Sequence, residues 1–146
     1  MRIVALVALM LAATSCAQRS DYVFVMPVES SAEDVRAATD AAAEWQSCEL
    51  VTVSVRVGTP EGEDVPLRRV DAIADYPLRS GDTFTVDGSP KSITFAHVTT
   101  LTQTTIAHEM GHALGLAHTN QGLMQAHYSG ARYVTFTECH NLRAAR

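Results

Sequence analysis

The chain has few of the features that mark several large classes of protein. Basic side chains are outnumbered, with 11 Lys and Arg against 16 Asp and Glu and a net charge of −5, so the surface does not favour nucleic acid. No internal repeat or low-complexity segment divides the 146 residues, so one domain is enough. The longest apolar run, residues 3–13, is too short to span a membrane stably. These absences indicate a single-domain protein whose partners are not nucleic acids.

The apolar run instead indicates export. It begins after Arg2 and ends in small residues, as a secretory signal peptide does, and we expect that peptide to cover residues 1–15. Residues 13–16 read Ala-Thr-Ser-Cys and resemble a bacterial lipobox, which predicts a lipid anchor on Cys16 and a lipoprotein of the outer membrane or cell surface. The alternative is ordinary signal cleavage beside Cys16, which predicts a periplasmic or secreted protein.

Export also bears on the few cysteines of the chain. Without Cys16, two remain, Cys48 and Cys139, an even pair in a chain bound for an oxidising compartment. A disulfide between them would tie the C-terminal segment to the end of the first predicted helix, and such bridges typically contribute about 2 to 4 kcal/mol. The alternative is two buried free thiols, each acting as a small hydrophobic side chain.

The hydrophobic pattern predicts both strands and helices. Strands are expected over residues 22–26, 50–57 and 70–74. A helix over residues 31–47 separates the first two strands, and this order suggests that the two strands pair in parallel. Residues 83–96 resemble a hairpin, so one of its strands would run antiparallel to the rest of the sheet.

Two further helices complete the predicted domain. Thr100, with Gln103 three residues later, resembles a capping box at the start of one helix, and Thr137 is expected to cap a short terminal helix. The expected architecture is an α+β domain over residues 21–146, α/β-like in its N-terminal part. Residues 16–20 would form a tether before it.

Residues 108–118 read His-Glu-Met-Gly-His-Ala-Leu-Gly-Leu-Ala-His, a spacing that builds a hydrolytic zinc site. His108 and His112 are four residues apart, on one face of a helix, and can bind the same metal ion. Gly115 can adopt the left-handed conformation that ends the helix and reverses the chain, which returns His118 as the third ligand. Three protein ligands leave the fourth tetrahedral position of zinc to water, as in catalytic sites.

Glu109 is the candidate general base of this site. It is rotated by about 100° from His108 around the helix, which places its carboxylate beside the open position of the metal. A structural zinc site needs no carboxylate there. The pattern therefore predicts peptide hydrolysis in which Glu109 takes a proton from a zinc-bound water and passes it to the departing amine.

The stretch 108–118, together with a Gly-Leu-Met sequence that ends at Met124, resembles the zinc signature and the Met-turn of the metzincin metallopeptidases. The resemblance implies that Glu109 is the catalytic base and that Met124 is a hydrophobic floor beneath the metal. The zinc ligands would be His108, His112 and His118. It also implies a twisted, mostly parallel five-stranded sheet with one antiparallel edge strand, a first helix, a zinc helix, the Met-turn and a C-terminal helix.

The residues around the signature leave the metzincin subfamily open. Thr119, after the third histidine, is matrixin-like, but only five residues separate His118 from Met124. Gln125 and Ala126 replace the Tyr-Pro that commonly follows the methionine in matrixins. Astacin-like and serralysin-like members place a tyrosine two residues after the methionine, whereas the nearest tyrosine here is Tyr128, four residues on.

Together these features predict an exported, monomeric zinc metalloendopeptidase that acts on a peptide or protein substrate. The substrate would dock in extended form along the edge strand, with residues 79–95 as the candidate rim. The alternative is a zinc-binding lipoprotein of weak or absent peptidase activity that presents the fold as a binding module. The carboxylate of Glu109 favours the enzyme.

Overall fold

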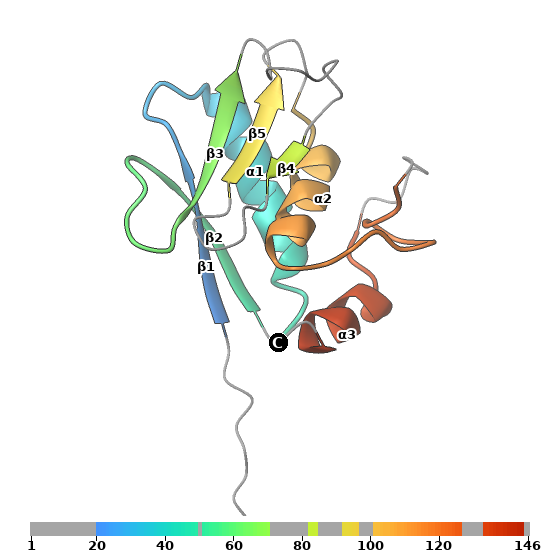
Figure 1. Ribbon diagram of the computed structural model, residues 1–146. Helices are drawn as coiled ribbons and strands as arrows, with labels where there is room; N and C mark the ends of the chain where they lie inside the picture. Colours follow the sequence, from blue (N-terminus) through green and yellow to red (C-terminus); the bar gives the residue numbers. More distant parts are fainter. Residues whose placement is uncertain are drawn as a thin grey trace, which may run out of the picture.

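The computed structural model describes residues 20–49, 51–70, 82–84, 92–96, 101–126 and 133–144. Within them the chain forms five strands and three helices (Figure 1). In chain order these are β1 Ser20–Met26, α1 Ala32–Trp45, β2 Val51–Val57, β3 Val65–Val70, β4 Asp82–Phe84, β5 Ser92–Ala96, α2 Gln103–Ala113 and α3 Phe136–Ala144. The expected signal peptide and Cys16 lie outside the described residues, and β1 begins at the last residue of the expected tether.

The strands form one sheet in the order β2-β1-β3-β5-β4. β1 pairs in parallel with β2 and with β3, and β3 pairs in parallel with β5. The short strand β4 runs antiparallel to β5 at one edge. Helix α1 connects the parallel pair β1 and β2, because a parallel connection needs a crossover. The mixed α/β architecture with a parallel sheet, expected from the sequence, is thereby confirmed.

Strand β3 begins five residues earlier than the sequence predicts. The hydrophobic pattern favours a strand over residues 70–74, of which residues 71–74 lie outside the described part. The first residues of β3 do not have a typical strand pattern, because Pro66 has no N–H and Arg68 and Arg69 interrupt the apolar residues. Pro66 is the second residue of the strand and precedes Leu67, where the pairing with β5 begins.

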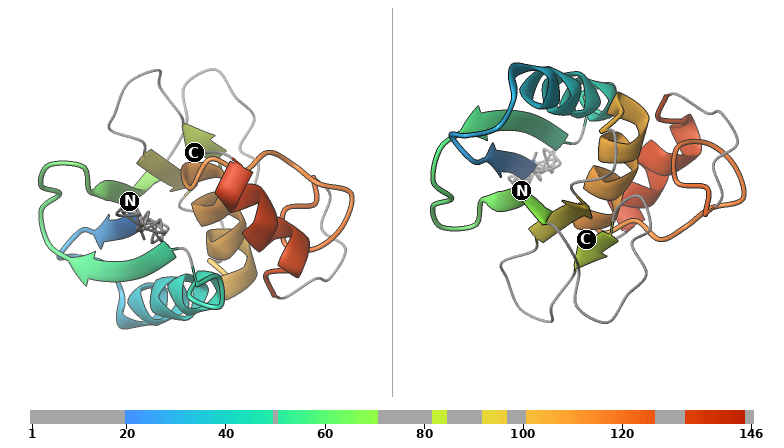
Figure 2. Two further views of the ribbon diagram at one scale, coloured as in Figure 1. Left: turned by 90° about the horizontal axis from the view of Figure 1, so that it is seen from below. Right: turned by 90° about the horizontal axis from the view of Figure 1, so that it is seen from above.

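Helices α1 and α2 cover the same face of the sheet (Figures 1 and 2). Ser31 caps α1 by accepting a hydrogen bond of 3.1 Å from the amide of Asp34, which satisfies one of the free donors of the first turn. The side chains between the helices and the sheet are buried and form the core. The largest of them are Trp45, Phe24, Phe95, Ile93, Ile106, Met110 and Met124.

The start of α2 differs from the prediction, and its physical cause is visible. Thr102, and not Thr100, is the N-cap, because its hydroxyl accepts from the amide of Thr105 at 3.2 Å. Gln103 does not fold back into a capping box, since its side-chain amide donates to Oε1 of Glu44 on α1 at 2.8 Å. The expected capping box at Thr100 is therefore wrong, and Gln103 instead ties α2 to α1.

Helix α3 also begins earlier than expected, and Thr135 takes the capping position that the sequence assigns to Thr137. Thr135 and Glu138 form a reciprocal capping box: the amide of Glu138 donates to the Thr135 hydroxyl at 3.3 Å, and the amide of Thr135 donates to Glu138 Oε2 at 2.6 Å. Thr137 therefore lies inside the first turn of α3.

Cys48 and Cys139 form a disulfide, with 5.2 Å between their Cα atoms. The bridge joins two residues 91 positions apart and ties α3 to the segment that follows α1. In the chain-entropy description, closing a loop of this length contributes about 4 to 5 kcal/mol. The terminal helix is thus fixed to the core that carries α1 and α2.

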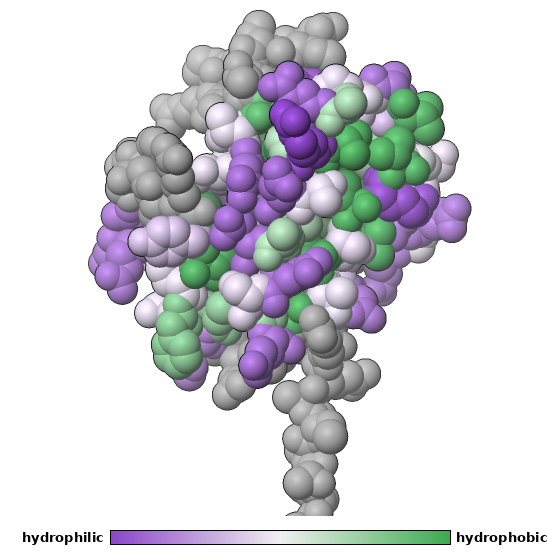
Figure 3. All heavy atoms as spheres, turned by 180° about the vertical axis from the view of Figure 1, so that it is seen from behind, coloured by the Kyte–Doolittle hydropathy of each residue, from purple (hydrophilic) through white to green (hydrophobic). Residues whose placement is uncertain are grey.

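The described surface carries hydrophilic and hydrophobic residues intermixed on the face turned away from the viewer of Figure 1 (Figure 3). The large apolar side chains exposed on the described part are Val28, Val57, Tyr133 and Phe136. Of the helices that the structure describes, none combines the length and the apolar character needed to cross a membrane.

Candidate metal centre

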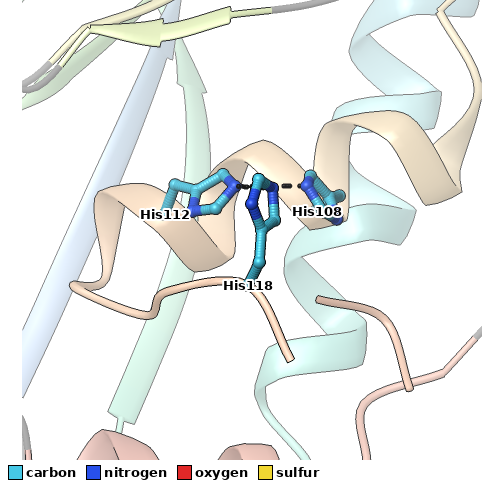
Figure 4. Close-up of side chains that lie close together, drawn as sticks. All are labelled: His108, His112 and His118. Carbon is cyan, nitrogen blue, oxygen red and sulfur yellow. Dashed lines mark hydrogen bonds between the residues drawn. The ribbon is translucent and has the colours of Figure 1, made fainter. Parts of the chain in front are cut away.

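Three histidine side chains converge beside α2 (Figure 4). His108 and His112 project from the helix, and His118 reaches them from the segment that follows it. Nε2 of His112 lies 3.2 Å from Nε2 of His108 and 3.1 Å from Nε2 of His118. The cluster expected from the spacing of residues 108–118 is therefore present.

The donor atoms of the cluster fit a metal ion. Ligand nitrogens about 2.0 to 2.1 Å from a tetrahedral zinc ion are about 3.3 Å apart, close to the separations observed. Nδ1 of His108 lies 2.7 Å from the carbonyl oxygen of Leu123, and Nδ1 of His112 lies 2.8 Å from that of Leu116. A carbonyl oxygen only accepts, so both Nδ1 atoms carry protons and, in the neutral rings, both Nε2 atoms present lone pairs. Two lone pairs at this distance repel one another unless a cation lies between them, as in histidine-ligated zinc sites.

The turn that returns the third histidine is the one the sequence predicts. Gly115 has a φ of +97°, in the left-handed region that favours glycine. Its amide donates to the carbonyl of His112 at 2.9 Å, and the amide of Leu116 donates to that of Gly111 at 3.0 Å. These bonds close the helix end in the manner of a Schellman motif and redirect the chain toward His118.

The cluster is accessible from solvent. His108 and His112 are half-buried, whereas His118 is exposed. A closed structural site would instead surround its metal with protein ligands. The exposure on the side of His118 therefore suits a centre that admits water and substrate.

Glu109 is buried, with 7% of its surface exposed. It follows His108 on α2, so its side chain leaves the helix about 100° further round the axis. Carboxylates are almost never buried without a compensating interaction, because desolvation of the charge is costly. Of the charged side chains in the described residues, only Glu109 and Glu138 are buried to this extent.

Met124 is fully buried and packs against the backbone of α2. A Cβ atom at Gly111 would overlap Sδ of Met124 and would lie 2.7 Å from Cζ2 of Trp45. Gly111 directly precedes the second histidine, so the absence of its side chain lets the methionine lie close to the zinc helix. This is where a hydrophobic floor would be placed.

Trp45 supports the site, although the sequence marks it only as part of an apolar helix face. Its indole Nε1 donates to the carbonyl of Ala107 at 2.9 Å, one residue before His108. The ring also lies against Gly111. The single tryptophan of the chain thus fixes α2 at two points around the first histidine. A single tryptophan in a chain is a candidate for a structural role, but the sequence does not reveal its partner, Ala107, which lies 62 residues away.

The segment that ends at Met124 is joined to the residue after the third histidine. The amide of Thr119 donates to the carbonyl of Met124 at 2.8 Å, and Thr119 forms an isolated bridge with Gln125. The short connection noted in the sequence is therefore closed by backbone hydrogen bonds. It places His118 and Met124 at the two ends of one small loop.

Glu138 is a residue of the site that sequence reasoning missed. It is completely buried, and Oε1 accepts from the amide of Met124 at 2.6 Å. Oε2 accepts from the amide of Thr135 at 2.6 Å and from its hydroxyl at 2.8 Å. The available signal was the spacing of Thr135 and Glu138, which is that of a capping box.

Two other parts of the sequence prediction cannot be placed. Tyr128 lies outside the described residues. Of the candidate substrate rim, residues 79–95, only the segments within β4 and β5 are described.

A mixed α/β domain that brings two histidines of a His-Glu-x-x-His helix together with a third from the segment after it defines a candidate metallopeptidase. A family model named Metallopep, described as "Putative peptidase family", matches residues 73–145, half of the chain. The chain belongs to this family, in agreement with its resemblance to the metzincins.

The chain was also compared with curated proteins and with solved structures. No curated protein matches the sequence. Among solved structures, the chain is similar to high choriolytic enzyme 1, a hatching enzyme zinc-protease from the medaka fish Oryzias latipes, with 17% sequence identity and a TM-score of 0.46. The similarity covers 67% of this chain and 44% of that one, so it spans less than half of the fish protein's length.

Proposed function

We propose that the protein is an exported zinc endopeptidase with Glu109 as its general base. The observation that carries the proposal is the convergence of three Nε2 atoms: those of His108 and His118 lie 3.2 and 3.1 Å from that of His112. Backbone carbonyls orient two of the three rings, those of His108 and His112. Membership of a peptidase family supports a hydrolytic use of that centre.

His108, His112 and His118 would hold the zinc ion. When bound, zinc supplies a Lewis acid that polarises a peptide carbonyl and lowers the pKa of water toward 7. Glu109, next to the first ligand on the same helix, takes a proton from the attacking water and delivers it to the departing amine. No covalent bond between enzyme and substrate is needed.

The substrate is an extended peptide that adds to the sheet at β4. This strand is the last in the sheet order, and no described strand pairs with its outer side. It also contacts α2, the helix that carries His108 and His112, so a peptide on this edge would lie on the side of the sheet nearest that helix. Main-chain hydrogen bonds to the strand would hold the peptide in register.

Export is supported by the disulfide, since such bonds persist in oxidising compartments. We propose that Cys16 carries a lipid anchor and that residues 21–146 form a single catalytic domain outside the cytoplasm. Exchange of Cys16 for serine should release the protein from membranes, and unchanged partitioning would rule out the anchor.

The test of the function compares the purified protein with Glu109→Gln, using Glu33→Gln as a matched control because Glu33 is exposed on α1. The measurements are bound zinc and cleavage of an unbiased peptide library. We expect zinc in all three proteins and cleavage by the wild type and the control alone. Zinc in every protein with cleavage by none would contradict the peptidase and favour the zinc-binding module.

A further inference from the structure

We propose that Glu138 is a positioning residue for the metal centre and acts on His108 through the peptide group between Leu123 and Met124. The inference rests on the proposed zinc site and concerns how its first ligand is held.

One peptide group connects the two side chains. Its N–H, from Met124, donates to Oε1 of Glu138 at 2.6 Å. Its carbonyl oxygen, from Leu123, accepts from Nδ1 of His108 at 2.7 Å. The C–N bond of a peptide has partial double-bond character, so charge drawn toward one end is felt at the other. Hydrogen bonds arranged in such a chain strengthen one another.

The burial of these hydrogen bonds strengthens the influence of Glu138 on His108. Glu138 and Met124 are both 0% exposed and Leu123 is 4% exposed, so water does not screen the carboxylate. Hydrogen bonds to an ionised acceptor are roughly twice as strong as neutral ones. The carbonyl of Leu123 is therefore a stronger acceptor than an ordinary backbone carbonyl, which keeps the proton of His108 on Nδ1 and leaves Nε2 to the metal.

This arrangement resembles the pairs in which a carboxylate directly orients a zinc-bound histidine, with a peptide group inserted between them. In those pairs the partner fixes the tautomer and the ring orientation and raises the basicity of the ligand atom. Glu138 would do the same for His108 through its hydrogen bond to the amide of Met124. The same carboxylate thus fixes the backbone of Met124 directly and the ring of His108 through the peptide group.

Several features hold the carboxylate in place. Thr135 donates to Oε2 through its amide and its hydroxyl, at 2.6 and 2.8 Å. Gly122 leaves room for both oxygens, since a Cβ there would lie 2.7 Å from Oε1 and 2.8 Å from Oε2. The next residue, Cys139, is tied to Cys48 by the disulfide. A carboxylate constrained on both oxygens is unable to leave the Met124 amide without disturbing α3.

The test uses Glu138→Gln, which keeps the size of the side chain and removes its charge. Thr135→Val is the matched control, because it removes one donor to Oε2 and leaves the carboxylate on the Met124 amide. Zinc affinity is measured by competition with a chelator, alongside thermal unfolding of the metal-free proteins. The resonance of the His108 Nδ1 proton in the zinc-loaded proteins reports on the chain of hydrogen bonds itself.

We expect Glu138→Gln to weaken zinc binding by about 10-fold to 100-fold and to move the His108 Nδ1 proton upfield. Thr135→Val should lower the unfolding temperature while both metal readouts stay near those of the wild type. If Glu138→Gln does not fold, Glu138→Asp shortens the side chain, withdraws the carboxylate from the Met124 amide and should reduce zinc affinity in the same direction.

The outcomes separate this inference from the proposed function. Tight zinc binding by the wild type with equal affinity in Glu138→Gln would overturn the role of Glu138 and leave the zinc site standing. Equal losses in Glu138→Gln and Thr135→Val would show that α3 acts only through stability. Absence of zinc binding in the wild type would overturn both proposals.

Discussion

The indole of Trp45 donates its N–H to the backbone carbonyl of Ala107, immediately before the first histidine of the cluster. The same ring lies against Gly111, immediately before the second. Helix α1 therefore holds the zinc helix at two positions that are one turn apart. Through this contact the packing of the core fixes the position of the helix segment that carries both ligands.

The first prediction concerns this contact. Trp45→Phe keeps an aromatic ring but loses a buried hydrogen bond worth about 1 kcal/mol, in addition to part of the packing. Trp45→Ala should cost about 3 to 5 kcal/mol because it leaves a large cavity under α2. Urea unfolding of the metal-free proteins measures both values. Equal stability of the wild type and Trp45→Phe would contradict the role of the indole N–H.

The second prediction concerns the close approach of Met124 to the zinc helix. Gly111→Ala places a methyl group where the Met124 sulfur lies, and we expect a loss of about 1 to 3 kcal/mol from overpacking. Met124→Ala alone should cost about 2 to 5 kcal/mol through the cavity it creates. Because the second change removes the methionine atoms that the first one meets and leaves only the contact with Trp45, the double variant should lose less than the sum of the two. Additive losses in unfolding experiments would show that the two positions are independent.

The third prediction concerns the disulfide. Replacing both Cys48 and Cys139 by serine should lower the free energy of unfolding by about 2 to 5 kcal/mol, because the crosslink between α3 and the core is lost. A reducing agent should lower the unfolding temperature of the wild type toward that of the double variant. The double variant is its own control, since it should not respond to the reductant. An unchanged melting temperature of the wild type under reduction would contradict the prediction.

The metal ligands could be predicted from the sequence because they are local. His108, His112 and His118 lie within eleven residues, and the helical repeat together with the turn at Gly115 determines where they point. Trp45 and Glu138 could not be predicted in the same way. Their roles depend on tertiary contacts, 62 residues from Trp45 to Ala107 and 14 from Glu138 to Met124, that no local pattern reveals.

The elements that were placed wrongly also have physical explanations. Several threonines precede α2, among them Thr99, Thr100 and Thr102, so the sequence offers more than one N-cap. Thr102 is the N-cap because its hydroxyl accepts from the amide of Thr105, while the side chain of Gln103 is directed to α1. Likewise β3 begins at a proline-containing, arginine-rich stretch whose pairing with β1 and β5 outweighs its weak strand pattern.

The central claim is that His108, His112 and His118 form one zinc site, and equilibrium zinc binding tests it most directly. His118→Ala removes an exposed ligand, and His140→Ala is the matched control because His140 is also exposed and lies on α3. We expect one zinc ion per chain in the wild type and in His140→Ala, and a loss of most of the affinity in His118→Ala. Equal zinc affinity in all three proteins would contradict the account.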